Sequence, residues 1–195
     1  FPFFSWTGDT AFWFQHENRL LLCRLRDGRT SIRNRIEDGA RNLAVHSPTL
    51  RAAFTSGGDL FLRLDPETLI RVTQDAGDGI SYGDPDVARS EFGIHEGIFW
   101  SPAGEAVAFY RRDQTNVTKY PLVDIDARPA ACRFIRYPMT GMASEEVQVL
   151  VHHIGSASTT VLRTGEPRDQ YLTHIVWTPD GRALLVTHLN RDQNR

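Results

Sequence analysis

Residues 79–83 read Gly-Ile-Ser-Tyr-Gly and match the spacing of a serine nucleophile elbow. Such an elbow requires a buried strand directly before the serine and a helix directly after it. Here the turn-like residues 75–78 precede the stretch, and Asp84-Pro85-Asp86 follows it. The rest of the chain also lacks the strand–helix alternation of a hydrolase domain. We therefore interpret residues 79–83 as a polar loop and predict that this chain carries no catalytic residue.

Two pairs of neighbouring side chains are of the types that bind cations. His152 and His153 lie in a strand-like stretch, where adjacent side chains point to opposite faces and cannot chelate one metal ion. We expect one of them to be buried and hydrogen-bonded and the other exposed. Glu145 and Glu146 begin the same stretch, and we expect them to form a solvated strand end. The sequence therefore predicts neither a metal site nor a cofactor.

The composition is ordinary for a globular domain. The 195 residues are 41% hydrophobic and 24% charged, with a formal net charge of −2. Nucleic-acid binding is not expected, because it needs a basic surplus gathered on one face. The longest apolar runs, such as 20–23 and 147–151, are too short to cross a bilayer. Cys23 and Cys132 stand alone in apolar, strand-like surroundings, and we expect both to be buried free thiols.

Hydrophobic residues follow the two-residue period of β-strands. Short runs rich in Val, Leu, Phe and Trp alternate with Gly, Pro, Asp and Asn, and turns recur every eight to twelve residues. The best candidate for a helix, residues 37–45, is interrupted by Gly39. The chain is therefore predicted to be all-β.

A repeated turn motif divides this pattern into units. Residues 99–104 read Phe-Trp-Ser-Pro-Ala-Gly and residues 176–181 read Val-Trp-Thr-Pro-Asp-Gly, and each is followed by an apolar strand. Counting two weaker copies, the Ser or Thr of the motif stands at positions 5, 47, 101 and 178, so the spacings are 42, 54 and 77 residues.

These spacings indicate the blades of a β-propeller. A four-stranded blade takes roughly 40–50 residues, so the first spacing is one blade and the second is one blade with an insertion of about ten residues. The third is either two blades or one blade with a long excursion. We predict a partial propeller of about four blades over residues 1–195. The rival architecture, a β-sandwich, needs no such recurring motif.

Further motifs give the chain a family resemblance. The first of these motifs is residues 91–112, which contain the first full turn motif. Four shorter motifs follow it: Lys-Tyr-Pro-Leu-Val-Asp at 119–124, Arg-Tyr-Pro-Met-Thr-Gly at 136–141, Gly-Glu-Pro-Arg at 165–168 and Leu-Asn-Arg-Asp-Gln-Asn at 189–194. In order and spacing this string resembles the N-terminal β-propeller of dipeptidyl peptidase IV-like serine peptidases of the prolyl oligopeptidase family, particularly its bacterial members.

The resemblance implies an eight-bladed propeller joined to a C-terminal α/β-hydrolase domain that carries the catalytic Ser, Asp and His. It implies a peptide substrate, release of dipeptides with Pro or Ala as the second residue, no cofactor, and a possible homodimer through the full-length protein. It also implies a periplasmic, cell-surface or secreted location. In the family, an insertion in the propeller carries two adjacent glutamates that bind the free α-amino group of the substrate.

This insertion corresponds to about residues 78–94, where the motif spacing is too long for one blade. The family reads Tyr-Glu-Glu-Glu-Phe where this chain has Ala88-Arg89-Ser90-Glu91-Phe92. By the resemblance Glu91 is a substrate-binding residue, whereas Ser90 replaces its acidic neighbour. Read from its type alone, Glu91 is a surface carboxylate or a helix cap.

The family also uses an arginine from an early propeller strand to contact substrate carbonyl groups. Arg29 is the candidate at the expected offset, in competition with Arg24, Arg26 and Arg33.

Two alternatives to a dipeptidyl peptidase propeller remain open. A propeller without catalytic function that binds a peptide or protein fits the replacement of an acid by Ser90. A related acylaminoacyl- or oligopeptidase, which accepts blocked N-termini, fits it as well.

Overall fold

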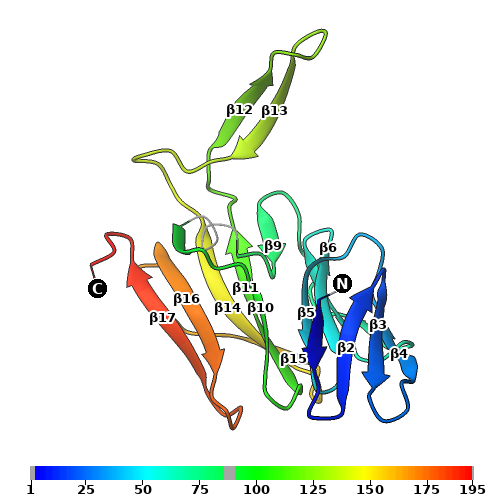
Figure 1. Ribbon diagram of the computed structural model, residues 1–195. Helices are drawn as coiled ribbons and strands as arrows, with labels where there is room; N and C mark the ends of the chain where they lie inside the picture. The colour runs from blue at the N-terminus through cyan, green and yellow to red at the C-terminus, as the bar shows by residue number, and fades with distance from the viewer. Residues whose placement is uncertain (1–2, 86–90, 195) are drawn as a thin grey trace.

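The chain folds into a series of antiparallel β-sheets that stand side by side in sequence order (Figure 1). The computed structural model describes residues 3–85 and 91–194. The first sheet contains β1 (Phe4–Trp6), β2 (Ala11–His16), β3 (Arg19–Arg24) and β4 (Thr30–Arg35). The second contains β5 (Arg41–His46), β6 (Arg51–Ser56), β7 (Asp59–Arg63) and β8 (Leu69–Arg71).

The third and fourth sheets continue the same arrangement. The third runs β10 (Ile98–Trp100), β11 (Ala106–Asp113), β14 (Glu146–His153) and β15 (Ser158–Val161), and β9 (Ile80–Tyr82) pairs with the far end of β11. The fourth is formed by β16 (Gln170–Trp177) and β17 (Leu184–Asn190). A series of antiparallel sheets, each with a path of up to four strands (in the third sheet β9 adds a fifth strand beside β11), is a series of propeller blades, so the all-β propeller prediction is confirmed.

The 77-residue spacing between the turn motifs at 101 and 178 contains one blade and an additional hairpin. β12 (Lys119–Asp124) and β13 (Ala131–Arg136) pair only with each other among the described strands, and their hairpin projects away from the third sheet (Figure 1). The chain then returns and enters β14. The hairpin also explains one wrong prediction: Cys132 lies on β13 and is exposed, whereas Cys23 on β3 is half-buried. Both cysteines are free.

The hydrophobic core consists of layers between neighbouring sheets. Leu20 and Phe54 are buried between the first and second sheets, and Leu62 and Phe109 between the second and third. Tyr110 lies in the layer that joins the third and fourth sheets. Because adjacent side chains of β11 face opposite sides, Phe109 and Tyr110 pack into different layers.

The tryptophans of the repeated motif connect the first strands of neighbouring sheets. Trp100 Nε1 donates to the carbonyl oxygen of Ala44 over 3.0 Å, and Trp177 Nε1 donates to the carbonyl oxygen of Phe99 over 3.0 Å. In the turn that follows Trp100, the Ser101 hydroxyl accepts a 3.0 Å hydrogen bond from the Ala106 amide. The motif is therefore both a turn and a contact between blades.

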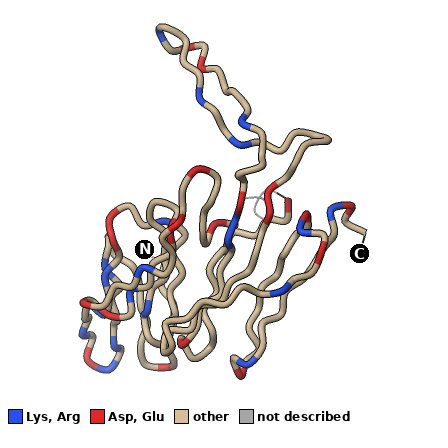
Figure 2. Tube along the Cα trace, turned by 180° about the vertical axis from the view of Figure 1, so that it is seen from behind, with Lys and Arg blue, Asp and Glu red and all other residues tan. Residues whose placement is uncertain are grey.

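Basic and acidic residues are interspersed along the sheets (Figure 2). Among the described residues, no helix is long and apolar enough to span a membrane.

Candidate substrate-recognition site

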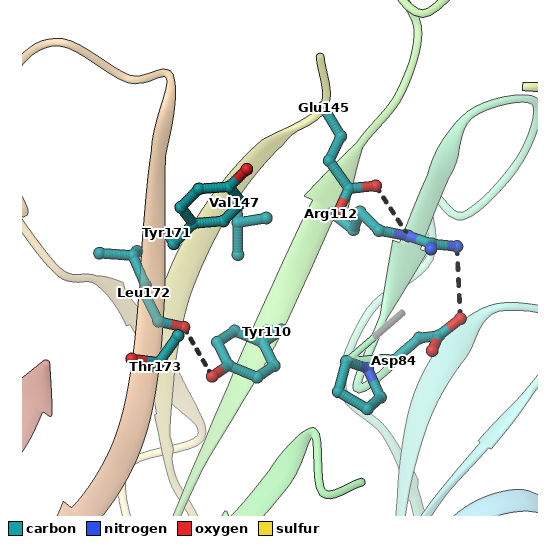
Figure 3. A pocket seen from close by; sticks show the side chains of 9 residues that line it. Asp84, Tyr110, Arg112, Glu145, Val147, Tyr171, Leu172 and Thr173 are labelled. Carbon is teal, nitrogen blue, oxygen red and sulfur yellow. Dashed lines mark hydrogen bonds and ion pairs between the residues drawn. The ribbon is translucent and has the colours of Figure 1, made fainter. Parts of the chain in front are cut away.

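A cluster of charged side chains lies where β9 meets the end of β11 (Figure 3). Arg112 Nη2 is 3.3 Å from Asp84 Oδ2, and Arg112 Nε is 3.8 Å from Glu145 Oε2. The same Nε donates to the Ser81 hydroxyl over 3.2 Å. The side chains of Arg112 and Glu145 are only 12% and 4% exposed. An unpaired charge is costly in a buried place, so moving Arg112 away from its partners would be unfavourable. The side chains of the cluster are therefore held in place.

Glu145 is not the solvated strand end that the sequence predicts. Glu145 is buried, and Gln114 Nε2 donates a hydrogen bond to its Oε2 over 2.9 Å. The prediction is wrong because the chain returns from the β12–β13 hairpin directly against β11, which places Glu145 beside Arg112. Glu146 is half-buried and lies 3.8 Å from Arg168.

The cluster borders a small cavity between the third and fourth sheets (Figure 3). Besides Asp84, Arg112 and Glu145 it is lined by Pro85, Tyr110, Val147, Tyr171, Leu172 and Thr173. Its volume of about 20 Å³ has room for about one water molecule. The Tyr110 hydroxyl donates to the Leu172 carbonyl oxygen over 2.8 Å, and burial raises the pKa of Tyr110, which keeps it a donor. The Tyr110–Leu172 hydrogen bond therefore joins the third and fourth sheets beside this cavity.

Glu91 is exposed and lies next to an aromatic contact with the fourth sheet. The ring of Phe92 meets that of Tyr171 edge-on, with 5.1 Å between centroids. Arg191 stacks on Tyr171 at 5.0 Å from the ring centroid, and its Nη1 donates to the Tyr171 hydroxyl over 2.6 Å. Ser90 and Arg89, the other positions of the family's acidic motif, fall outside the described residues.

Arg29 lies far from this region in the fold. It is exposed in the turn between β3 and β4, with its Nε 3.7 Å from Asp27 Oδ2. This turn is bonded to the β1–β2 turn, since the Leu25 amide donates to the Thr10 carbonyl. The turn motifs share that end of the sheets, whereas β9 pairs with β11 at the end opposite to its turn motif. The structure does not bring Arg29 and Glu91 together.

The remaining sequence candidates have structural roles. Ile80–Tyr82 is the short strand β9, not a loop, and Tyr82 is buried. Ser81 in β9 accepts a hydrogen bond from Arg112. His152 is buried with Nδ1 2.9 Å from the Thr159 hydroxyl, and His153 is exposed, which confirms the expected arrangement of that pair. Within residues 3–85 and 91–194, no group of three or more His, Cys, Asp or Glu could hold a metal ion.

Sequence reasoning missed Arg112, although a signal was present. Arg112 shares a face of its strand with Ala108 and Tyr110, which are buried. An arginine at such a position requires a buried carboxylate partner. The partners, Asp84 and Glu145, come from distant segments and cannot be identified from local patterns.

Comparison with known proteins places these features in a family. Residues 3–195 match the model of the dipeptidyl peptidase IV (DPP IV) N-terminal region. The chain belongs to this family. It is a domain associated with peptidases, and the prediction from its motifs is confirmed. The DPP IV-like chain is 28% identical over 176 residues to a probable dipeptidyl-aminopeptidase B of Botryotinia fuckeliana, and 29% identical over 176 residues to that of Sclerotinia sclerotiorum.

Those alignments cover 80% of this chain and 19% of each relative, so the chain spans about a fifth of their length. Among solved structures, a dipeptidyl aminopeptidase IV candidate from Bacteroides ovatus is 36% identical, with a TM-score of 0.83 over 97% of this chain and 26% of the other. Dipeptidyl peptidase 4 of Porphyromonas gingivalis is 21% identical, with a TM-score of 0.72 over 98% of this chain and 27% of that chain, and it supports the fold alone.

Proposed function

We propose that this DPP IV-like chain is the substrate-recognising and gating part of a serine exopeptidase that removes dipeptides from peptide N-termini. The observation that carries the proposal is the family match over residues 3–195, together with relatives named as dipeptidyl aminopeptidases. The catalytic serine belongs to an α/β-hydrolase domain of the same protein, in a periplasmic, cell-surface or secreted setting. A homodimer of the full-length protein is part of the same proposal.

In this proposal the 78–94 segment receives the free N-terminus of the peptide. The Glu91 carboxylate is exposed and accepts charge-assisted hydrogen bonds from the α-ammonium group. A hydrolase serine at a fixed distance then cuts after the second residue. Arg29 remains a candidate for a separate contact with the substrate, with no support from its position.

Glu91→Gln in the full-length protein tests this role, and Glu96→Gln is the matched control because Glu96 is an exposed glutamate of the same connection. Loss of one charge-assisted contact is expected to lower kcat/KM on a free-amine Ala-Pro chromogenic substrate by roughly 10- to 150-fold. Glu96→Gln should leave kcat/KM unchanged. Wild-type kinetics of Glu91→Gln would remove Glu91 from the proposed site.

One observation favours a second candidate. Ser90 leaves a single carboxylate where the family has adjacent glutamates. A weaker amine receptor suits an acylaminoacyl- or oligopeptidase, which would cleave N-acetylated substrates as fast as free ones. The same substrates therefore separate the two candidates.

A further inference from the structure

The two described ends of the 78–94 segment contact different sheets. The first end lies on the third sheet: the Gly83 amide donates to the Tyr110 carbonyl oxygen over 2.8 Å, and Asp84 meets Arg112. The second end lies on the fourth sheet through the contact of Phe92 with Tyr171. Both contacts surround the cavity where these sheets meet.

The first contact is ionic and largely buried. The Arg112 guanidinium reaches Asp84 and Ser81, which precede the segment's acidic position, and Glu145, which begins the return of the chain into β14. The Asp84 side chain is 28% exposed, whereas those of Arg112 and Glu145 are nearly inaccessible. Such a cluster has one favourable arrangement, because every displacement separates a buried charge from its partner.

The second contact is aromatic and is itself supported. Tyr171 lies on β16, and its hydroxyl accepts a hydrogen bond from Arg191, which follows β17 and also stacks on the ring. The Tyr171 ring is thereby fixed between Arg191 and Phe92. Because Phe92 is the next residue after Glu91, the position of the Glu91 backbone depends on this contact.

We infer that Arg112 and Tyr171 are positioning residues that anchor the two ends of the 78–94 segment to neighbouring blades and so set the place of Glu91. The importance of this position for substrate binding rests on the proposed function, but the anchoring itself does not. Neither residue touches the substrate in this scheme. The packing of the third blade on the fourth thereby becomes part of N-terminus recognition.

Amide hydrogen exchange of Arg112→Met tests the first anchor. The reporters are the amides of Tyr82 and Gly83, which are bonded to the Gly58 and Tyr110 carbonyls. Their exchange should become roughly tenfold faster, because the segment opens locally more often. The control is Arg63→Met, since Arg63 has the same 12% side-chain exposure and pairs with Glu37 between the first two sheets. It should leave both reporters at the wild-type rate.

Asp84→Asn keeps the test decisive if Arg112→Met does not fold. It removes one ion pair and leaves Arg112 beside Glu145, so the same reporters should exchange faster by a smaller factor. Wild-type exchange of Tyr82 and Gly83 in the folded variants would overturn the anchoring by Arg112.

Tyr171→Ala tests the second anchor, and Tyr171→Phe is its control because the ring that meets Phe92 is retained. Tyr171→Ala should raise the exchange of the amides between residues 91 and 97. Tyr171→Phe should raise it less, because this variant loses only the hydrogen bond from Arg191 and keeps both ring contacts. Equal exchange in the two variants would overturn the role of the ring.

Kinetics of the full-length protein separate this inference from the proposed function. Displacement of Glu91 in Arg112→Met and Tyr171→Ala should raise KM for free-amine substrates more than it lowers kcat, since a binding contact is lost. Arg63→Met should keep both constants, and Tyr171→Phe should change them less than Tyr171→Ala does. Faster exchange with unchanged KM would support the anchoring and contradict the role of Glu91. Unchanged exchange would overturn the anchoring whatever the kinetics show.

Discussion

Buried carboxylates in this chain are each held by a cation and further donors. Asp59, at the start of β7, accepts hydrogen bonds from Arg71 Nη2 over 2.6 Å, the Thr73 hydroxyl over 2.8 Å and the Ala76 amide over 3.1 Å. Burial alone would raise the pKa of Asp59, but these bonds outweigh it and hold the pKa below its ordinary value. Asp59 therefore fixes the chain that leads from β8 toward the 78–94 segment.

Asp59→Asn is expected to lower the free energy of unfolding at pH 7 by about 1.5–3 kcal/mol, the contribution of hydrogen bonds to a charged group. The pKa of Asp59 is lower in the folded state than in the unfolded state. The carboxylate therefore stabilises the fold above pH ~4, and this contribution is lost as the pH falls through the folded pKa. Urea unfolding at pH 7 and pH 3 checks this prediction. A wild-type-to-variant difference that stays constant with pH would contradict it.

At the scale of elements, the repeated turn motif positions each blade against the previous one. Gly104 has φ +70°, a left-handed conformation that favours glycine, and a Cβ there would lie 2.6 Å from His46 Nδ1. His46 is buried and fixed, with Nε2 3.0 Å from the Pro102 carbonyl oxygen and Nδ1 2.8 Å from the Thr49 hydroxyl. The turn of the third blade thus packs directly on the end of β5.

Gly104→Ala and Gly181→Ala form a matched pair that measures this packing. Gly181 stands at the same motif position with φ +69°, but its Cβ would meet no atom closer than 3.6 Å. Backbone strain is expected to cost each variant about 1–3 kcal/mol. Gly104→Ala should be the less stable of the two in chemical unfolding, because His46 must also move. An equal loss of unfolding free energy in the two variants would contradict this prediction and show that His46 moves aside without cost.

Local patterns account for the elements but not for the site. Alternating apolar residues and the Trp-Ser-Pro-x-Gly turn act over a few residues, so strands such as β10 and β11 and the blade spacing could be predicted. Arg112, Asp84 and Glu145 meet only after the chain has left the third blade and returned. Their cluster, and the exposure of Cys132 on the projecting hairpin, depend on this long-range path, which short-range periodicity does not contain.

At the scale of the whole molecule, stability resides in the layers between sheets, and the β12–β13 hairpin stands outside them (Figure 1). The residues of β12 are exposed. The base of the hairpin is different, since Arg136 donates to the Gln114 carbonyl oxygen over 2.8 Å and its Nη2 lies 2.9 Å from Asp78 Oδ1. The hairpin is thus an appendage whose base contributes to the blade.

Replacing residues 121–134 by Asn-Gly should leave the free energy of unfolding within about 1 kcal/mol of wild type, because surface changes of this kind remove no core contact. The new two-residue turn joins Tyr120 and Ile135, which already face each other across the hairpin. Arg136→Met should cost more, although it changes one side chain. Thermal unfolding compares the two. A shortened hairpin that abolishes cooperative unfolding would contradict this division of stability.

The proposed function depends most directly on one ratio, kcat/KM for a free-amine Ala-Pro substrate divided by kcat/KM for its N-acetylated form, measured on the full-length protein. A receptor for the α-ammonium group predicts a ratio of at least about 10, since a charge-assisted contact is lost on acetylation. A ratio near one would contradict N-terminus recognition and favour a peptidase of blocked peptides. No cleavage of either substrate would favour a propeller that binds peptides without catalysis.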